Sequence, residues 1–321
     1  MTSQRRMHWK CGGTLLALII AIYCFVKYMH SPAIETYSGT VTTCDNLENI
    51  FRTEKTQIMD SDLQATPIFP ETKTDKCIKT VKWKFLEYFS KAEENGFKHC
   101  IRKNAYPKRL LKYYFERLNR NITSKFFSFL KGKSDVVVVE IGGFTGQLLQ
   151  KLVPITGAKT YAVLEPVPSF FDKLNTHIDM LNLNSIVKTY NFGLGKTYKE
   201  ISVDIRGDGT SIFQTLPSKK TERIKIVNVV DFFVQVGVGC NTVDLLTINC
   251  EGCEFDILET VISTNLIEKF DHIQFQPHHD VPTVGNYICR YCRLRGLLAR
   301  THEIEYEYPH IWEAWKRKKI N

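Results

Sequence analysis

The chain has 321 residues, of which 43% are hydrophobic and 24% are charged. This is ordinary globular composition, and it excludes a disordered or fibrous protein. The formal net charge is +9, but four unopposed basic residues lie in 1–30 and four more lie in 316–321. The rest of the chain is nearly neutral, so the composition favours no nucleic-acid-binding surface, and we expect no nucleic-acid partner.

An apolar run near the N-terminus predicts a membrane helix. Residues 11–26 carry no charge, and the flexible side chain of Lys27 lets the span continue to residue 29. The 19 residues of 11–29 form a helix of about 28 Å, close to the roughly 30 Å of a bilayer core. We therefore predict an uncleaved signal anchor over 11–29. A cleaved signal peptide and a buried core helix are the alternatives.

The charges around this span predict its orientation. Arg5, Arg6 and Lys10 precede the span, and only Lys27 directly follows it. The positive-inside rule then leaves a cytosolic tail, 1–10, and sends the rest of the chain across the membrane. We expect a single-pass type II protein of the Golgi or endoplasmic reticulum with a lumenal catalytic domain.

The cysteines bear on the same question. Eight lie outside the span, and an even count favours disulfides in an oxidising compartment. We expect at least one disulfide and leave the pairing open. Cys250-x-x-Cys253 and Cys289-x-x-Cys292 also resemble zinc-ligand pairs, but the 35 residues between them exceed the usual gap. We expect no metal site.

The remaining chain divides into a stem and one large domain. Residues 30–78 are rich in polar residues and proline without a sustained period, which is typical of a stem. Residues 79–321 form the predicted domain, which opens with helical patterns over 79–95 and 107–130.

From residue 135, strand patterns alternate with helical ones. Val136 to Val139 form a continuous β-branched run that ends in a glycine turn, as expected of a buried parallel strand. The alternation predicts an α/β fold, a Rossmann-like doubly wound and mostly parallel sheet. Residues 302–308 predict a late antiparallel edge strand. The other predicted strands are 161–164, 186–191, 224–230, 244–248 and 272–276, and the predicted helices are 147–153, 169–182, 231–236, 255–263 and 281–297.

The loop after the first strand predicts a cofactor site. It reads Glu-Ile-Gly-Gly-Phe-Thr-Gly over 140–146 and leads into a helix, whose N-terminus presents free N–H groups. Glu165 follows 19 residues after Gly146, at the end of the second strand. An acidic side chain in that place can accept both ribose hydroxyls of a nucleoside.

The spacing of the glycines separates the cofactor classes. The dinucleotide fingerprint G-x-G-x-x-G fails from Gly142, where Phe144 is third, and from Gly143, where Thr145 is third. An acidic residue followed by Gly-x-x-x-Gly suits a cofactor without pyrophosphate, and S-adenosyl-L-methionine fits. A glycine-rich turn without any ligand is the alternative.

Four blocks resemble the FkbM-type methyltransferases, a branch of the S-adenosylmethionine-dependent Rossmann-like enzymes of the class I methyltransferase type. The resemblance covers roughly 135–280. The blocks are 138–146, 164–171 with Leu174 and Asn182, 191–195, and 244–254 with Leu258. The Glu165-Pro166 pair and the Glu-Gly-x-Glu sequence from Glu251 are the most specific parts.

The resemblance implies roles for single residues. Glu165 would hold the ribose. The methionine end would be wrapped by Glu140, Gly142 and Gly146, with Thr145 nearby, and the adenine would lie by Asn191, Phe192 and Gly193.

Three further residues are candidates for catalysis. Asn249 stands where the family usually has aspartate, which removes a charge beside the sulfonium. Glu251 is a candidate catalytic or substrate-binding residue, although an acidic residue here also suits the N-terminus of the following helix. His278 follows the strand ending at Gln276 and could deprotonate a hydroxyl, although a turn histidine in solvent fits as well.

The sequence thus predicts an S-adenosylmethionine-dependent O-methyltransferase in the secretory pathway. Its acceptor would be a hydroxyl of a small molecule or a glycan. The alternatives are a non-catalytic, membrane-tethered Rossmann-like binding protein and an NAD-dependent oxidoreductase or epimerase. The oligomeric state stays open.

Overall fold

The computed structural model describes Cys44, Leu63 and residues 65–69, 74–83, 89–104, 124–207, 209–212, 220–278 and 286–319. The predicted cytosolic tail, the predicted signal anchor and most of the predicted stem lie outside the described residues. Among the described residues, no helix has the length and apolar character needed to cross a bilayer.

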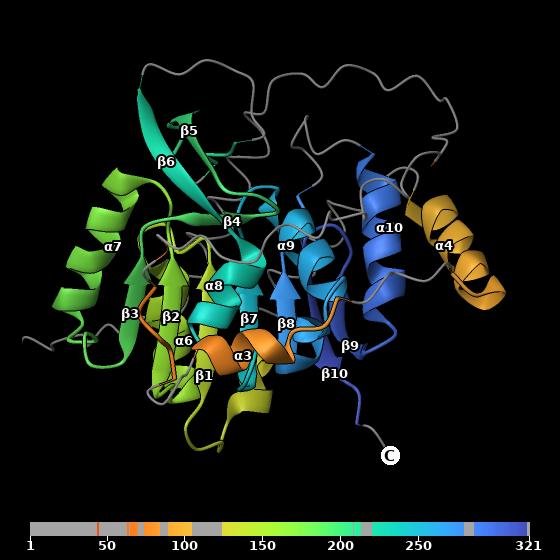
Figure 1. The fold of residues 1–321 in the computed structure, drawn as a ribbon, viewed down its shortest axis with the longest axis horizontal. Helices are drawn as coiled ribbons and strands as arrows, with labels where there is room; N and C mark the ends of the chain where they lie inside the picture. Colours follow the sequence, from red (N-terminus) through yellow and green to blue (C-terminus); the bar gives the residue numbers. More distant parts are fainter. Residues whose placement is uncertain are drawn as a thin grey trace, which may run out of the picture.

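A seven-stranded sheet forms the centre of the protein (Figure 1). Five neighbouring strands are parallel, in the order β3-β2-β1-β7-β8, and an antiparallel strand, β10, joins β8 to the edge strand β9. The strands are β1 (Val137–Ile141), β2 (Thr160–Leu164), β3 (Val187–Tyr190), β7 (Val243–Ile248), β8 (Phe270–Phe275), β9 (His302–Tyr308) and β10 (Trp312–Arg317). This arrangement confirms a mostly parallel, doubly wound α/β sheet.

The valine run of β1 explains why this strand is central. Val137, Val139 and Ile141 face one hydrophobic core, whereas Val138 faces the other, and all are buried. A strand covered on both faces needs an apolar side chain at every position, not at alternate ones. In register, Val138 lies beside Tyr161 of β2 and Leu245 of β7.

Helices cover both faces of this sheet (Figure 1). The first core includes α8, α9, α10 and part of α3, whereas the second includes α6 and α7. The helices are α3 (Thr74–Thr80), α4 (Lys91–Asn104), α6 (Gln147–Thr156), α7 (Pro168–Met180), α8 (Val229–Gln235), α9 (Cys253–Ile262) and α10 (Tyr287–Leu298), with 3₁₀ helices η1 (Ser124–Leu130) and η2 (Asn265–Lys269).

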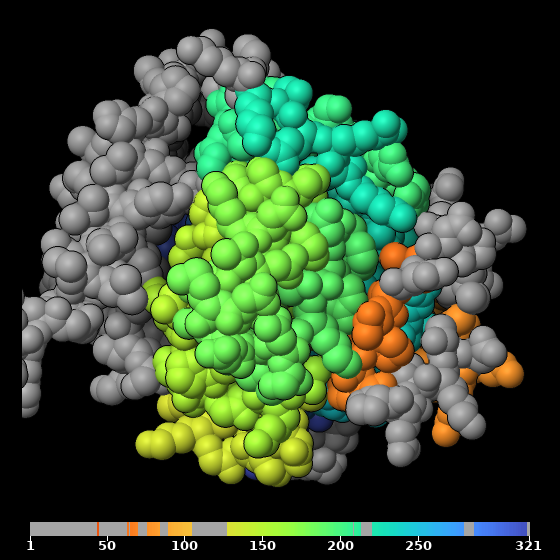
Figure 2. Space-filling model, turned by 90° about the vertical axis from the view of Figure 1, so that its left-hand side faces the viewer, coloured from red at the N-terminus to blue at the C-terminus, as the bar shows by residue number. Residues whose placement is uncertain are grey.

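A second, three-stranded sheet lies above the carboxyl ends of the parallel strands (Figure 1). Its order is β4-β6-β5, from β4 (Gly193–Gly195), β6 (Thr221–Asn228) and β5 (Lys199–Asp204). Val203, Ile224 and Ile226 pack on Phe170 of α7, so the small sheet is anchored to the main domain. In Figure 2, teal residues of this region lie above the green residues that include α7.

One predicted strand is confirmed and one predicted helix is wrong. The expected antiparallel edge strand over 302–308 is β9, which pairs antiparallel with β10 at the edge of the sheet. The expected helix over 79–95 is wrong: α3 ends at Thr80 and α4 begins at Lys91. Ser90 and Glu93 form a capping box that starts α4, with Glu93 accepting from the Ser90 N–H at 2.7 Å and Ser90 Oγ accepting from the Glu93 N–H at 3.3 Å.

Four disulfides among the described residues confirm the expectation of at least one. Three join segments far apart in the sequence: Cys44–Cys289, Cys77–Cys240 and Cys100–Cys292. The fourth, Cys250–Cys253, joins residues three apart. Leu63, Ile68 and Cys77, which fall within the range expected to be a stem, are buried in the first core. The N-terminal part of the described chain therefore packs on the sheet and is covalently attached to it.

Candidate functional site

A pocket lies at the carboxyl edge of the main sheet, beneath the small sheet. It falls where the strand order reverses between β1 and β7, the point at which open α/β sheets bind their ligands. Its walls come from the ends of β1, β2 and β7, from the small sheet, and from residues 207 and 210–212. The lining residues discussed below are Gly142, Phe144, Glu165, Phe192, Gly193, Ser211, Asn249, Cys250, Glu251 and Cys253.

Two glycines shape the loop between β1 and α6. Gly142 has φ 90°, and a Cβ there would lie 1.9 Å from the backbone oxygen of Asn249. The glycine therefore lets the loops after β1 and β7 touch, and protein backbone fills the space beside it. Gly146, also at φ 90°, is the N-cap of α6, and a Cβ there would lie 3.1 Å from the His177 ring.

Glu165 is a buried carboxylate of the pocket and directly follows β2. Its Oε2 accepts the N–H of Phe144 at 2.8 Å, and its Oε1 accepts the N–H of Val167 at 2.9 Å. Burial raises the pKa of Glu165 to about 7, although the two backbone N–H groups act in the opposite direction. Each carboxylate oxygen can accept more than one hydrogen bond, so this side chain can also bind hydroxyl groups of a ligand.

The wall next to Glu165 is largely apolar. Phe144 packs edge-on against Phe170, with ring centroids 4.7 Å apart. Phe192, which precedes β4, packs against Phe232 of α8 and still lines the pocket. Ile226 of β6 lines the same pocket from the small sheet. A flat heteroaromatic ring suits such walls, because it gains from dispersion and stacking.

Glu251 lies at the other side of the pocket, in the loop from β7 to α9. Its backbone is left-handed, with φ 56°, and its carbonyl oxygen accepts the hydroxyl of Ser211 at 2.5 Å. Its Oε1 lies 3.1 Å from Nε2 of His278. The carboxylate thus joins the pocket wall to a buried histidine.

His278 is buried between two carboxylates. Its backbone N–H donates to Glu254 Oε1 at 2.8 Å, and its Nδ1 lies 3.2 Å from the same oxygen. Burial by itself lowers the pKa of His278, but Glu251 and Glu254 raise it well above its usual value. The imidazole is therefore protonated at neutral pH, and its neighbours form a pair of acceptors around a cation.

Six of the predicted site residues line the pocket: Gly142, Glu165, Phe192, Gly193, Asn249 and Glu251. The other five do not line it. The buried carboxyl of Glu140 accepts the Tyr161 hydroxyl at 2.6 Å, and burial raises its pKa to about 8. The Thr145 backbone oxygen lies 2.8 Å from His177 Nδ1, and Gly146 caps α6. Asn191 donates to the Glu165 backbone oxygen at 2.9 Å, and His278 lies behind Glu251.

Sequence reasoning missed two parts of the site. The small sheet contributes Val203, Ile224 and Ile226 to the pocket. Only the apolar alternation of 224–230 indicated a strand there, and nothing in it indicated a pocket wall. The spacing of Cys250 and Cys253 resembles that of a zinc-ligand pair, but the two residues form a disulfide, and both line the pocket. No group of three or more metal-binding side chains occurs among the residues that the structure describes.

Comparisons with known proteins find only distant structural similarity. No family model and no curated protein sequence matches the chain. Solved structures with some likeness include the METTL16 methyltransferase domain, at 11% identity and TM-score 0.37, covering 63% of this chain and 68% of that one. Another is M. capricolum TrmK with S-adenosyl-homocysteine, at 12% identity and TM-score 0.33, covering 62% and 70%. A third is the ribosomal protein L11 methylase of Lactobacillus delbrueckii subsp. bulgaricus, at 11% and 0.34, covering 61% and 77%. TM-scores this low do not establish a shared function.

Proposed function

We propose that the chain is an S-adenosylmethionine-dependent O-methyltransferase. The observation that carries the proposal is the pair of carboxylates that face one pocket at the strand-order reversal, Glu165 after β2 and Glu251 after β7. Glu165 is placed to bind the ribose of a nucleoside cofactor, and Glu251 is placed to accept the proton of an acceptor hydroxyl. The resemblance of residues 135–280 to the FkbM-type methyltransferases supports the same proposed function.

The residues of the pocket fit this cofactor better than a dinucleotide. Glu165 would accept the ribose hydroxyls, and Phe144 and Phe192 would flank the adenine. In dinucleotide sites a glycine lets the backbone approach the pyrophosphate. Here the Cβ side of Gly142 packs on the backbone of Asn249, and the loop 140–146 lacks the G-x-G-x-x-G spacing of dinucleotide sites. The bound cofactor would supply an electrophilic methyl group on a sulfonium.

The geometry favours Glu251, not His278, as the proton acceptor. Glu251 lines the pocket, whereas His278 is buried behind it and, with its raised pKa, already carries a proton. As the acceptor oxygen gains the methyl group, its proton would pass to the Glu251 carboxylate. The imidazolium 3.1 Å away would hold that carboxylate in place. Asn249, at the same wall, can donate or accept a hydrogen bond but cannot take the proton.

The proposal also covers the acceptor substrate and the cellular compartment. We propose a small-molecule or glycan hydroxyl as the acceptor, and a lumenal domain in the Golgi or endoplasmic reticulum tethered by the anchor over 11–29. The four disulfides support an oxidising compartment. The near-neutral body of the chain gives no support for a nucleic-acid acceptor.

Calorimetric titration of S-adenosylmethionine into the full chain in detergent tests the cofactor. We expect binding, and we expect Glu165→Gln to weaken it about 10- to 100-fold, the usual value of hydrogen bonds to a charged group. Asp172→Asn, an exposed carboxylate of α7, is the matched control and should bind as the wild type does.

Any of three results would contradict the proposal. If the folded wild type does not bind S-adenosylmethionine but binds NAD, an oxidoreductase gains support. If S-adenosylmethionine binds equally well to Glu165→Gln, the ribose contact is wrong. Binding without methyl transfer to any secretory-pathway glycan or small molecule would favour the non-catalytic tethered protein.

A further inference from the structure

The Cys250–Cys253 disulfide differs from the other three in its place and exposure. In each of the others one cysteine is buried: Cys289, Cys77 or Cys292. Cys250 and Cys253 are both partly exposed, and both line the pocket. Their separation of three residues also makes this the disulfide that least restricts the unfolded chain, because loop-closure entropy grows with loop length. A contribution to global stability therefore does not explain the Cys250–Cys253 disulfide.

What this disulfide constrains is the backbone that carries Glu251. The two residues between the cysteines are both left-handed, Glu251 at φ 56° and Gly252 at φ 111°. A glutamate rarely adopts this conformation, which costs free energy unless the surroundings enforce it. The disulfide closes the loop around both residues, directly before α9 begins at Cys253.

Neighbouring contacts depend on the same loop conformation. The Ser211 hydroxyl donates to the Glu251 carbonyl at 2.5 Å, and the Gly252 N–H donates to Glu254 Oε2 at 2.9 Å. With the loop closed, Glu251 Oε1 lies 3.1 Å from His278 Nε2. The disulfide thus lies within the loop that brings Glu251 to His278.

We propose that Cys250 and Cys253 are the positioning residues of the reaction centre: as a disulfide they hold Glu251 against His278, and as thiols they release it. The catalytic role given to Glu251 in this proposal rests on the function proposed above. The effect of the disulfide on the position of Glu251 does not depend on that function.

Reduction would act through two local changes. A dithiol such as dithiothreitol would give two electrons and two protons to the Cys250–Cys253 bond, yielding two thiols and its own cyclic disulfide. Glu251 could then leave its left-handed conformation. The freed Cys250 Sγ, already 3.7 Å from Glu254 Oε2, would also compete for that carboxylate. Because this pair is the more exposed one, we expect it to open first.

Histidine NMR on the full chain in detergent tests the positioning. With ¹³C-labelled histidine, the resonance that His278→Gln removes reports the pKa of His278. We expect Cys250→Ser/Cys253→Ser to lower this pKa by roughly one pH unit or more, because Glu251 then contributes less. The matched control, Cys77→Ser/Cys240→Ser, removes a disulfide outside the pocket and should leave the pKa unchanged.

Limited reduction of the folded wild type gives a second route if the serine variant does not fold. Alkylation and mass spectrometry should find Cys250 and Cys253 modified first, together with the same fall in the pKa of His278. An unchanged pKa in either experiment, or opening of another disulfide before this one, would overturn the proposal. Absence of S-adenosylmethionine binding by the oxidised wild type would instead count against the proposed function, and the NMR result would still stand.

Discussion

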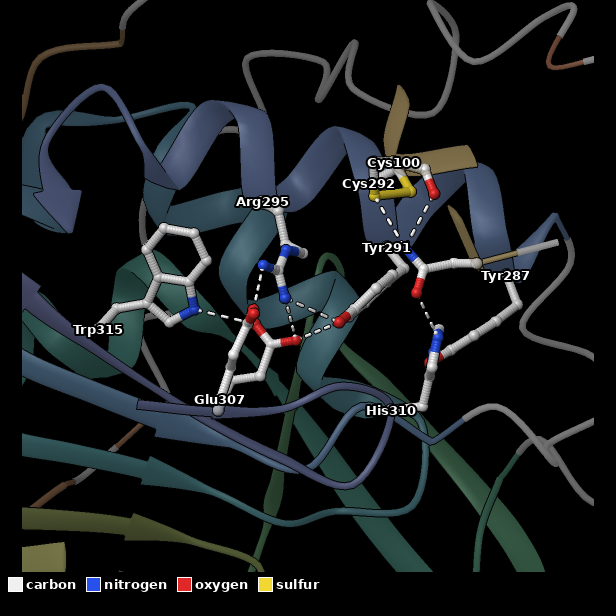
Figure 3. A network of polar contacts seen from close by, with 10 residues as sticks. Cys100, Tyr287, Tyr291, Cys292, Arg295, Glu307, His310 and Trp315 are labelled. Carbon is white, nitrogen blue, oxygen red and sulfur yellow. Dashed lines mark hydrogen bonds and ion pairs between the residues drawn. A yellow bond between two sulfur atoms is a disulfide. The ribbon is translucent and has the colours of Figure 1, made fainter. Parts of the chain in front are cut away.

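Two buried ionic clusters of this protein look alike in composition and differ in what they can do. The pocket cluster consists of Glu251, Glu254 and His278. The α10 cluster consists of Tyr291, Arg295, Glu307, Glu313 and Trp315, and links α10 to β9 and β10 (Figure 3). Next to it, His310 bridges Tyr287 at 2.8 Å and Asn104 at 2.9 Å, close to the Cys100–Cys292 disulfide that joins α4 to α10 (Figure 3).

The α10 cluster is closed, in the sense that both oxygens of its central carboxylate, Glu313, accept hydrogen bonds from protein groups. Glu313 is completely buried, and its Oε1 accepts from Tyr291 and, at 2.6 Å, from Arg295. Its Oε2 accepts from the Trp315 indole at 3.1 Å. No pocket wall includes this carboxylate among the described residues. The pocket cluster likewise has two carboxylates for one cation, the His278 imidazolium, but one of them, Glu251, faces the pocket. Burial of charge alone does not mark a functional site; an oxygen that also faces a pocket does.

The largest expected effect comes from breaking the closed cluster. Arg295→Met should lower the free energy of unfolding by about 3–5 kcal/mol, because it leaves the buried Glu313 carboxylate without its cation. Lys98→Met, which removes an exposed partner of Glu94, should change the free energy of unfolding little, because solvent screens this pair. Urea unfolding measures both. Equal losses would mean that Arg295 is not neutralising Glu313.

A smaller effect is expected from Glu254→Gln in the pocket cluster. The two oxygens of Glu254 accept from His278 and from the Gly252 N–H, and a glutamine offers only one acceptor oxygen. We expect a loss of about 1–3 kcal/mol. Glu200→Gln, at an exposed ion pair, is the control and should change little.

The pH dependence of this variant sharpens the comparison. The raised pKa of His278 stabilises the fold fully below 6.5, and that stabilisation is lost as the pH rises through the folded value. Glu254→Gln lowers the folded value, so the loss of this stabilisation, which begins near pH 6.5 in both proteins, should be smaller and complete at a lower pH in the variant. Urea unfolding across pH 6 to 9 would show this. Parallel curves for both proteins would contradict the role given to Glu254.

The third prediction concerns a buried carboxyl without a cation, Glu140. Its pKa is about 8 in the fold against 4.5 in the unfolded chain, so the folded state holds an extra proton between these values. Its contribution to stability is therefore greatest below pH 4.5 and falls as the pH rises, by at most about 1.4 kcal/mol per pH unit. Glu140→Gln keeps an acceptor for the Tyr161 hydroxyl and should flatten this fall. Identical slopes in thermal or urea unfolding would mean that Glu140 is ionised in the fold.

Local patterns predicted much of the main sheet. The valine run of β1, the loop 140–146 and the position of Glu165 are all written in a few neighbouring residues. The capping box at Ser90 and Glu93 was equally local and could have separated α3 from α4. β10 was not predicted, because Glu313, Lys316 and Arg317 obscure its alternation. Glu313 is buried only because Arg295, Tyr291 and Trp315 meet it from other parts of the chain.

The sequence by itself determined the alternation of strands and helices, the glycine turn, and the acidic residues after β2 and β7, because these depend on backbone conformation and on residue spacing. Only the tertiary structure decided which of the candidates share a pocket. It turned Glu140 toward Tyr161, placed His278 behind Glu251, and brought the small sheet over Glu165. It also paired Cys250 with Cys253 while sending Cys289 and Cys292 to distant partners. These outcomes depend on contacts between residues far apart in the chain, which local propensity does not encode.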